Sequence, residues 1–170
     1  MQNVILVDKN DNELGLCEKI SAHKEKRLHR AFSVFLFNEK KELLIQKRAC
    51  SKYHSGNLWS NSCCSHQQLG NTIEEDVLNC VKKELGASCD NIKRIFDFIY
   101  EADLGDMYEY EYDYVIFANV KGNINPNPDE VQEVKWIAME TLNIDINLNS
   151  EKYTAWFKAI LKEKQKYFFD

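Results

Sequence analysis

Short apolar runs along the chain predict a set of β-strands. They cover residues 4–7, 32–37, 43–48, 92–100, 107–120 and 132–137. The second and third runs are separated only by the turn-like sequence Asn38-Glu-Lys-Lys41, so we expect them to pair as a central hairpin. A turn over residues 103–106 separates the two longest runs. The pattern therefore predicts a sheet built mainly from antiparallel neighbours.

Two other segments have the spacing of amphipathic helices. From residue 73 to residue 85 an apolar side chain occurs at every fourth position, Thr72 and Glu75 can form a capping box, and Gly86 follows as a stop signal. A second helix is expected over residues 150–166, with its apolar residues on one side. We predict an α/β domain of the layered α+β type, with a mixed, mostly antiparallel sheet flanked by helices, and a single domain over residues 1–170.

Composition and charge exclude several functional classes. The chain has 22 Lys and Arg against 27 Asp and Glu, a formal net charge of -5, so we expect no nucleic-acid partner. The longest nearly apolar run, residues 31–37, is far shorter than the roughly 20 residues that span a bilayer. Residues 4–7 have no basic flank or cleavage site. We expect a cytoplasmic protein without a membrane partner, whose six cysteines are free thiols.

Acidic and imidazole side chains suggest a metal site. Glu109, Glu111 and Asp113 alternate with tyrosines, so on a strand the three carboxylates share one face. They repel each other unless that face is solvated or the carboxylates share a cation. With three histidines, His23, His29 and His66, the first two carboxylates would make an N3O2 set suited to zinc or manganese. The alternatives are a solvated strand edge and histidines without a ligand role, which we also expect of the isolated His54.

Two further residues carry possible chemistry. Cys64 lies two residues before His66, so on a strand the two share a face while Cys63 points the other way and packs. Glu84 lies in the last turn of the helix that ends before Gly86, where the helix dipole disfavours a carboxylate. Its side chain is therefore either exposed or recruited by a cation.

These residues belong to a longer set of motifs that resembles the type I isopentenyl-diphosphate isomerases of the Nudix superfamily. The resemblance covers nearly the whole chain, and its most specific part is Trp59-x-Asn-Ser-x-Cys-x-His66. Its other parts are Leu14-Gly-Leu-Cys-Glu-Lys19, Ala22-His23, Arg27-Leu-His-Arg-Ala-Phe-Ser33, Lys47-Arg48-Ala49, Ser51-Lys52, Gln68-Leu69-Gly70, Glu84-Leu85-Gly86, Tyr100, Glu109-x-Glu111, Asp129-Glu130-Val131, Trp136 and Trp156. The fold it implies is Nudix-like.

The resemblance implies interconversion of isopentenyl diphosphate and dimethylallyl diphosphate. Cys64 would be the acid or base on one face of the substrate, and Glu111 would act on the opposite face with Tyr100 hydrogen-bonded beside it. Trp156 would present its ring to the carbocation. From helical spacing alone, a core aromatic is an equally good interpretation of Trp156.

The same resemblance implies the ligands of ions and substrate. His23, His29, His66, Glu109 and Glu111 would hold zinc or manganese, and Glu84 a magnesium ion bound to the diphosphate. Lys19, Arg48 and Lys52 would neutralise the diphosphate, although by spacing alone each is an ordinary surface charge. The expected partner is a small-molecule diphosphate, and the expected state a monomer or weak dimer.

The chain departs from the family pattern in its helix. Asn79 and Cys80 stand where the family has an arginine pair, one of which helps to bind diphosphate. Lys82 and Lys83 are the candidates to compensate, but we place them elsewhere on the helix and predict weaker substrate affinity.

Two rival functions remain at this point. A Nudix hydrolase would need the box Gly-x5-Glu-x7-Arg-Glu-(apolar)-x-Glu-Glu-x-Gly, and five of its positions are replaced here, by Ser65, Asn71, Asn79, Cys80 and Lys83. A non-catalytic metal or diphosphate-binding module would lack Cys64 or Glu111, and both are present.

Overall fold

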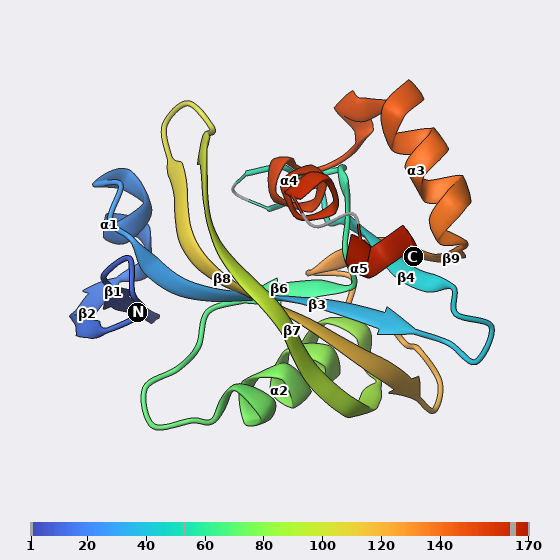
Figure 1. Cartoon of the computed structure of the whole chain (residues 1–170), viewed down its shortest axis with the longest axis horizontal. Coiled ribbons are helices and arrows are strands. Elements are labelled where there is room, and N and C mark those ends of the chain that lie inside the picture. The colour runs from blue at the N-terminus through green and yellow to red at the C-terminus, as the bar shows by residue number, and fades with distance from the viewer. Residues whose placement is uncertain (1, 53, 164–165, 170) are drawn as a thin grey trace.

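The computed structural model describes residues 2–52, 54–163 and 166–169, which form one mixed sheet with helices on both faces (Figure 1). The strands are β1 (Asn3–Val7), β2 (Glu13–Glu18), β3 (His29–Phe37), β4 (Leu43–Arg48), β5 (Trp59–Ser60), β6 (Cys63–Ser65), β7 (Ser88–Asp103), β8 (Tyr108–Lys121) and β9 (Val131–Ile137). The helices are α1 (Lys19–Lys24), α2 (Ile73–Leu85), α3 (Met139–Leu148), α4 (Ala155–Glu163) and α5 (Lys166–Phe169), with a 3-10 turn at Ser150–Lys152. The predicted layered α+β class is confirmed.

The centre of the sheet differs from the predicted hairpin. β3 pairs with β4 only next to the turn, at Phe37 and Leu43. Beyond that point β4 pairs antiparallel with β9, while β3 runs parallel to β8 along its whole length and pairs with the short β6. The prediction was wrong because the partners that compete for β3 and β4 lie far along the chain, beyond the reach of local patterns.

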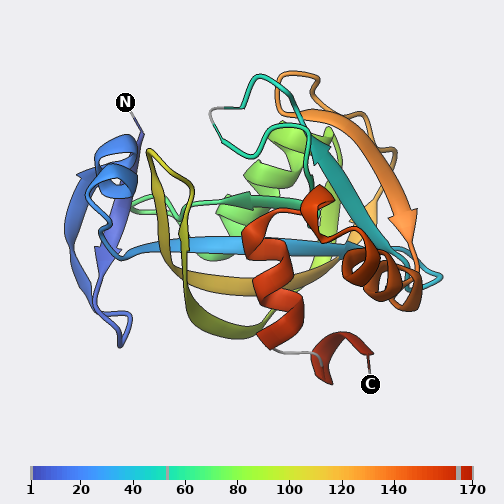
Figure 2. The same cartoon turned by 90° about the horizontal axis from the view of Figure 1, so that it is seen from above.

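The two faces of the sheet carry separate apolar clusters. One lies under α2 and takes alternate residues of the central strands, such as Phe32, Val34 and Tyr114. The other lies under α3, α4 and α5 and takes the residues between them, such as Phe35 and Val115. Figure 2 shows α4 lying across the sheet on this second face. Because strand side chains alternate, each functional residue on β3 or β8 must face one of these two sides.

Local signals placed α2 correctly. Thr72 and Glu75 form the predicted capping box, and Gly86 ends the helix in the left-handed conformation at a φ of 58°. A Cβ at Gly86 would lie 2.3 Å from the backbone oxygen of Asn125, so only glycine fits there. Alone, a 13-residue helix is marginal in water, and buried side chains such as Val77 and Val81, each contributing roughly 1.5–3 kcal/mol, hold it on the sheet.

The C-terminal helix was predicted too long. Residues 150–166 divide into the 3-10 turn, an extended Tyr153 and α4, and the part of the prediction at residues 164–165 lies outside the described residues. Three helices, α1, α3 and the short α5, were not predicted. α1 has only six residues, and its start is capped by the Glu18 carboxylate, which accepts hydrogen bonds from the N–H groups of Ile20 and Ser21. Such a short helix is stabilised by its cap and its contacts, so it leaves no apolar periodicity.

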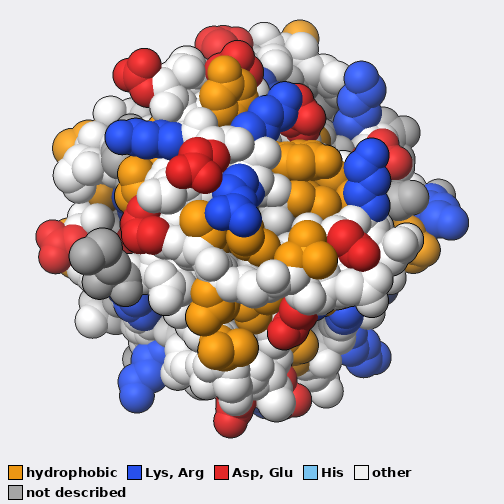
Figure 3. Space-filling view, turned by 90° about the vertical axis from the view of Figure 1, so that its left-hand side faces the viewer, with side chains coloured by type: hydrophobic (Ala, Val, Ile, Leu, Met, Phe, Trp, Pro, Cys, Tyr) orange, Lys and Arg blue, Asp and Glu red, His pale blue; other side chains and the backbone are white. Residues whose placement is uncertain are grey.

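The N-terminal hairpin forms one end of the molecule. β1 buries Val4 and Leu6 against Ala22 of α1, while β2 leaves Leu14 and Leu16 exposed. Figure 3 views this end and shows its apolar side chains interrupted by charged ones. Among the described residues, none of the helices has the length and apolar character needed to cross a membrane.

Candidate active site

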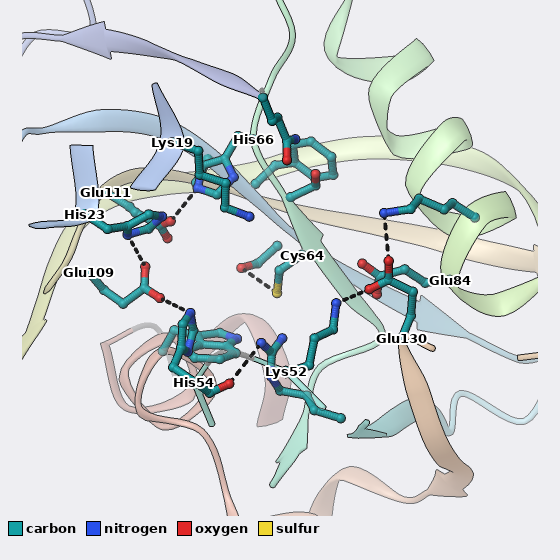
Figure 4. Close-up of a pocket in the computed structure, with 18 residues that line it drawn as sticks. Lys19, His23, Lys52, His54, Cys64, His66, Glu84, Glu109, Glu111 and Glu130 are labelled. Atoms are coloured by element: carbon teal, nitrogen blue, oxygen red, sulfur yellow. Dashed lines mark hydrogen bonds and ion pairs between the residues drawn. The ribbon is translucent and has the colours of Figure 1, made fainter. Parts of the chain in front are cut away.

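A pocket opens on the sheet face that carries α4, beside that helix. It collects side chains from α1, β3, β6, β8, α2, α4 and the loops before β5 and β9. They include Lys19, His23, Ser33, Arg48, Lys52, His54, Cys64, His66, Lys83, Glu84, Glu109, Glu111, Glu130 and Trp156. Figure 4 shows His23, Glu109 and Glu111 at one end, Glu84 and Glu130 at the other, and Cys64 between them.

Backbone carbonyls orient two of the histidines. The Nδ1 of His23 lies 2.9 Å from the oxygen of Tyr108, and that of His29 lies 2.7 Å from the oxygen of Arg27. A carbonyl oxygen only accepts, so Nδ1 carries the hydrogen in both rings and Nε2 presents a lone pair. Both rings are buried, and the Nε2 of His23 has no hydrogen-bond partner among the described residues. This is the arrangement of metal-ligating histidines, in which a backbone carbonyl accepts from the other ring nitrogen and fixes the tautomer.

His66 and Glu111 complete the centre. The Nε2 of His66 lies 3.2 Å from the Nε2 of His29 and 3.0 Å from Oε1 of Glu111, which is itself 3.5 Å from the His29 Nε2. Burial lowers the pKa of His66 to about 3, so its ring is neutral at pH 7. Burial raises the pKa of Glu111, but its contacts with the rings of His29 and His66 outweigh this effect and hold that pKa well below its ordinary value. A neutral His66 ring therefore contacts an ionised Glu111 carboxylate.

The strand register brings these residues together. His29 of β3 pairs directly with Glu111 of β8, and Ser33 of β3 pairs with Cys64 of β6. His23, His29, His66 and Glu111 each offer a ligand atom, and these atoms all lie within 4.8 Å of one another. This separation and the buried lone pair on His23 fit a divalent metal ion.

Glu109 of the predicted five-residue set lies beside this group and outside it. One carboxylate oxygen is 3.1 Å from the Nε2 of His54, and the other is 3.7 Å from the Nδ1 of His23. Burial and the neighbouring charge of Glu111 raise the pKa of Glu109 well above its ordinary value. A carboxyl that resists ionisation in this way can be returned to the charged state by a nearby cation.

His54 is a pocket residue that the sequence did not reveal. We expected an isolated loop histidine, but it lies in the pocket, in contact with Glu109 and with its ring 5.8 Å from that of Trp156. Burial and the charge of Arg48 lower the pKa of His54 to about 3. Its partners lie 55 and 102 positions further along the chain, so no local motif could have pointed to it.

The two adjacent cysteines face opposite ways, as their strand position predicts. Cys63 is fully buried in the cluster under α2, and Cys64 lines the pocket. All six cysteines fall within the described ranges and are free. Burial, together with the Asp113 charge, raises the pKa of Cys64 well above its ordinary value, so the thiol keeps its proton at neutral pH.

A polar wall stands behind Cys64. The Asn61 amide donates to the oxygens of Val34 and Cys63, so its Oδ1 faces the Cys64 sulfur at 3.2 Å. On the other side the Ser33 hydroxyl lies 3.5 Å from the same sulfur and donates to Asp113 at 2.9 Å. Neither the contact of Asn61 with Cys64 nor that of Asp113 with Ser33 was predicted, because these contacts depend on strand pairing.

Tyr100 and Trp156 are both buried at this site. Tyr100 pairs with Glu111 across β7 and β8, but its hydroxyl has no hydrogen-bond partner among the described residues. The hydrogen bond predicted between these two residues is therefore not formed, because the Glu111 oxygen is turned to the histidines. Arg48 lies over the indole of Trp156, with Cζ 5.1 Å from the ring centroid, so this ring face holds a cation.

Charged side chains gather at the other end of the pocket. Glu130 forms ion pairs with Lys52 and with Lys83, and Gln46 donates to Glu84 at 3.0 Å. Burial raises the pKa of Glu84 above its ordinary value. Our placement of Lys83 away from the site was wrong: it lines the pocket, because it follows Asn79 by one helical turn and shares its face.

Burial lowers the pKa of Lys19, although the nearby carboxylates Glu111 and Glu109 oppose this effect. Lys19 lines the pocket together with Arg48 and Lys52, so all three predicted diphosphate-binding cations open onto the same space. They come from the start of α1, the end of β4 and the loop that follows it.

Comparison with known proteins agrees with this architecture. The profile of the NUDIX domain matches residues 27–157. A crystal structure of a Deinococcus radiodurans protein superimposes with a TM-score of 0.70 at 21% identity, covering 87% of this chain and 90% of that one. The MutT NUDIX hydrolase from Burkholderia pseudomallei gives 0.64 at 15% identity, covering 79% and 96%. By its fold and domain match, the chain is a NUDIX domain protein.

Relatives of higher sequence identity show which family within this class the chain belongs to. "Isopentenyl-diphosphate Delta-isomerase 2" from Photorhabdus laumondii is 42% identical over 159 residues, which are 93% of this chain and 89% of the relative. The protein of the same name from Aromatoleum aromaticum is 40% identical, covering 93% and 84%. "Isopentenyl-diphosphate Delta-isomerase" from Photobacterium profundum is 40% identical, covering 95% and 93%. The chain belongs to the isopentenyl-diphosphate Delta-isomerase family.

Proposed function

We propose that this chain interconverts isopentenyl diphosphate and dimethylallyl diphosphate, with residues 1–170 acting as one domain. The observation that carries this proposal is that Cys64 and Glu111 line one pocket between a histidine centre and a set of cations. The reaction moves one carbon–carbon double bond and leaves the diphosphate intact. It therefore needs an acid, a base and an anchor for the diphosphate.

The acid and the base are Cys64 and Glu111. The alkene is not activated, so one group must protonate its terminal carbon to give a tertiary carbocation, and the other must remove a proton from carbon 2. The Cys64 thiol holds its proton at neutral pH, whereas the pKa of Glu111 is depressed and that side chain is a carboxylate. The pair thus contains one proton donor and one acceptor.

Two aromatic residues support the carbocation in this scheme. Trp156 is buried in the pocket wall and attracts the guanidinium of Arg48, and its indole can attract a substrate cation in the same way. Tyr100 lies next to Glu111 with an unpaired hydroxyl that can donate to the carboxylate once substrate binds. Burial raises the pKa of Tyr100 well above its ordinary value, so this hydroxyl stays protonated.

His23, His29, His66 and Glu111 would hold a zinc or manganese ion, with Glu109 as the fifth ligand after a side-chain rotation. When bound, the ion supplies positive charge that fixes the Glu111 carboxylate and lowers the pKa of its neighbours. In the metal-free chain the same carboxylate is oriented by the imidazole rings of His29 and His66.

The opposite end of the pocket suits the diphosphate. Lys19, Arg48 and Lys52 provide positive charge, and the half-buried Glu84 carboxylate fits a magnesium ion shared with phosphate oxygens. Cys64 lies between this end and the histidine centre, where the isoprenyl carbons of an anchored substrate would lie (Figure 4).

The test is to incubate zinc-loaded protein and magnesium with pure isopentenyl diphosphate, and to follow dimethylallyl diphosphate and inorganic phosphate together. We expect the isomer without phosphate. Cys64→Ala and Glu111→Gln should each lower the rate by at least 1,000-fold, on the order expected for loss of general acid–base catalysis together with loss of orientation.

Cys63→Ala is the matched control, because it removes the neighbouring thiol from the core face and leaves the pocket unchanged. It should retain most of the activity. Release of phosphate would instead point to hydrolysis, the reaction that the substitutions in the Nudix box disfavour, and would refute the proposal.

A further inference from the structure

α2 lacks the positive charge of the family's arginine pair at positions 79 and 80, but it carries a lysine one helical turn further along. Position 80, where the family pattern has an arginine, holds Cys80, whose side chain is buried in the cluster under α2. Asn79 is uncharged and lines a second hollow next to the pocket. Lys83 follows Asn79 by four residues, lines both this hollow and the pocket, and is the only lysine of α2 among the described residues that does so.

Glu130 fixes where this lysine points. The Nζ of Lys83 lies 2.7 Å from Oε1 of Glu130, and the second oxygen of the same carboxylate accepts from Lys52. The carboxylate is half-buried, and burial raises its pKa while the hydrogen bonds from the two lysines lower it to a net value below the ordinary one. Two ammonium groups from separate elements therefore converge on one anion in the pocket lining, and Figure 4 shows Lys52 beside Glu130.

Two lysines that bind the same carboxylate create a positive potential, which favours binding of an anion at this position. The half-buried Glu84 lies next to Lys83 in sequence and opens onto the same pocket, and the like charge of Glu130 adds to burial in raising its pKa. A magnesium ion on these carboxylates would free both ammonium groups to turn toward phosphate oxygens. Lys83 is 69% exposed, so it can make this turn without disturbing the core.

We propose that Lys83 is a diphosphate-binding residue of this chain, positioned by Glu130, in place of the missing arginine pair. The identity of the substrate in this inference rests on the proposed function. The role of Lys83 does not depend on the reaction, because it requires only a magnesium-bound diphosphate. Lys83 touches the end of the substrate that does not react, so it contributes to binding and not to proton transfer.

The experiment uses magnesium pyrophosphate as the probe, titrated calorimetrically into the zinc-loaded protein. Lys83→Ala should raise the dissociation constant about tenfold, and Lys83→Arg should restore it to within about threefold. The loss should shrink as salt is added, because a partly exposed ammonium acts through screened charge. In the isomerase assay Lys83→Ala should raise KM about tenfold and leave kcat within twofold.

Lys82→Ala is the matched control, since it removes the same charge from an exposed neighbouring position outside the pocket. Unchanged pyrophosphate binding by Lys83→Ala, or an equal loss in Lys82→Ala, would overturn the proposal. A wild-type protein that binds pyrophosphate but forms no dimethylallyl diphosphate would refute the proposed function alone. Melting temperatures within about two degrees of wild type would show that both variants fold.

Discussion

Asp113 tests whether burial and a neighbouring charge keep a carboxyl group protonated beneath the candidate active site. Its side chain is 1% exposed, one oxygen accepts from Ser33, and the other has no hydrogen-bond partner among the described residues. Burial and the nearby Glu111 charge raise the pKa of Asp113 to about 8. The folded, metal-free protein should therefore contain a neutral carboxylic acid at pH 7, and Asp113→Asn should imitate it with little change of shape.

The direction in which stability changes with pH follows from the pKa of Asp113 in the folded and the unfolded chain. Between the unfolded pKa of about 3.9 and the folded value of about 8, the folded chain binds one proton more than the unfolded chain, so stability from this group falls as pH rises. Each pH unit in this range lowers the free energy of unfolding by up to about 1.4 kcal/mol. From pH 5 to pH 7, the stability of Asp113→Asn relative to wild type should therefore increase by up to about 3 kcal/mol.

Urea unfolding of chelator-treated protein at pH 5, 6 and 7 measures this difference. The lowered pKa values of His23, His54 and His66 make both proteins more stable as pH rises toward 6.5, and this contribution cancels in the comparison. Asp106→Asn, in an exposed turn, reports the effect of losing one surface charge. A difference that stays constant to within about 0.5 kcal/mol over the range would mean that Asp113 is ionised when folded, and would refute the reasoning.

Three further predictions concern the fold and the metal centre. Gly86→Ala should lower the free energy of unfolding by at least about 2 kcal/mol in urea, because its methyl group would meet the Asn125 oxygen at 2.3 Å. Ser62→Ala should cost about 1–3 kcal/mol in the same assay, because the Leu36 N–H and the Leu44 oxygen lose their shared partner at 2.8 and 2.6 Å. Zinc should raise the melting temperature of chelated wild type but have little effect on His66→Ala, and an equal rise in both would exclude His66 as a ligand.

The parts of the fold that sequence predicted well are those encoded locally. The cap at Thr72, the stop at Gly86 and the alternation of β8 each need only a few neighbouring residues. The central pairing was wrong because β3 takes its parallel partner from β8, whose first paired residue lies 82 positions away. α3 was not predicted because only two of its side chains, Met139 and Leu142, are buried, which leaves little apolar periodicity.

The residues of the candidate site also divide into those that the sequence predicted and those that depend on contacts between distant segments. Cys64, Glu111 and the three histidines were found through motif resemblance. In the structure Cys64, Glu111, His23 and His66 line one pocket, and the buried His29 lies beside His66 and Glu111. His54 and Asp113 were not predicted as site residues because their roles depend on contacts between distant segments. Lys83 was misplaced because we compared it with the aligned arginine positions and not with the helix face that it shares with Asn79.

The parallel register of β3 and β8 links the chemistry of this protein to its folding. Opposite faces of β8 supply Glu111 to the pocket and Tyr114 to the cluster under α2, so inserting one residue would exchange the two faces beyond that point. Such an insertion would bury carboxylates beneath the helix and turn tyrosines toward the histidines. Length variation in this region is therefore tolerable in the turn between β7 and β8, and bound zinc would report that the two strands have paired in the correct alignment.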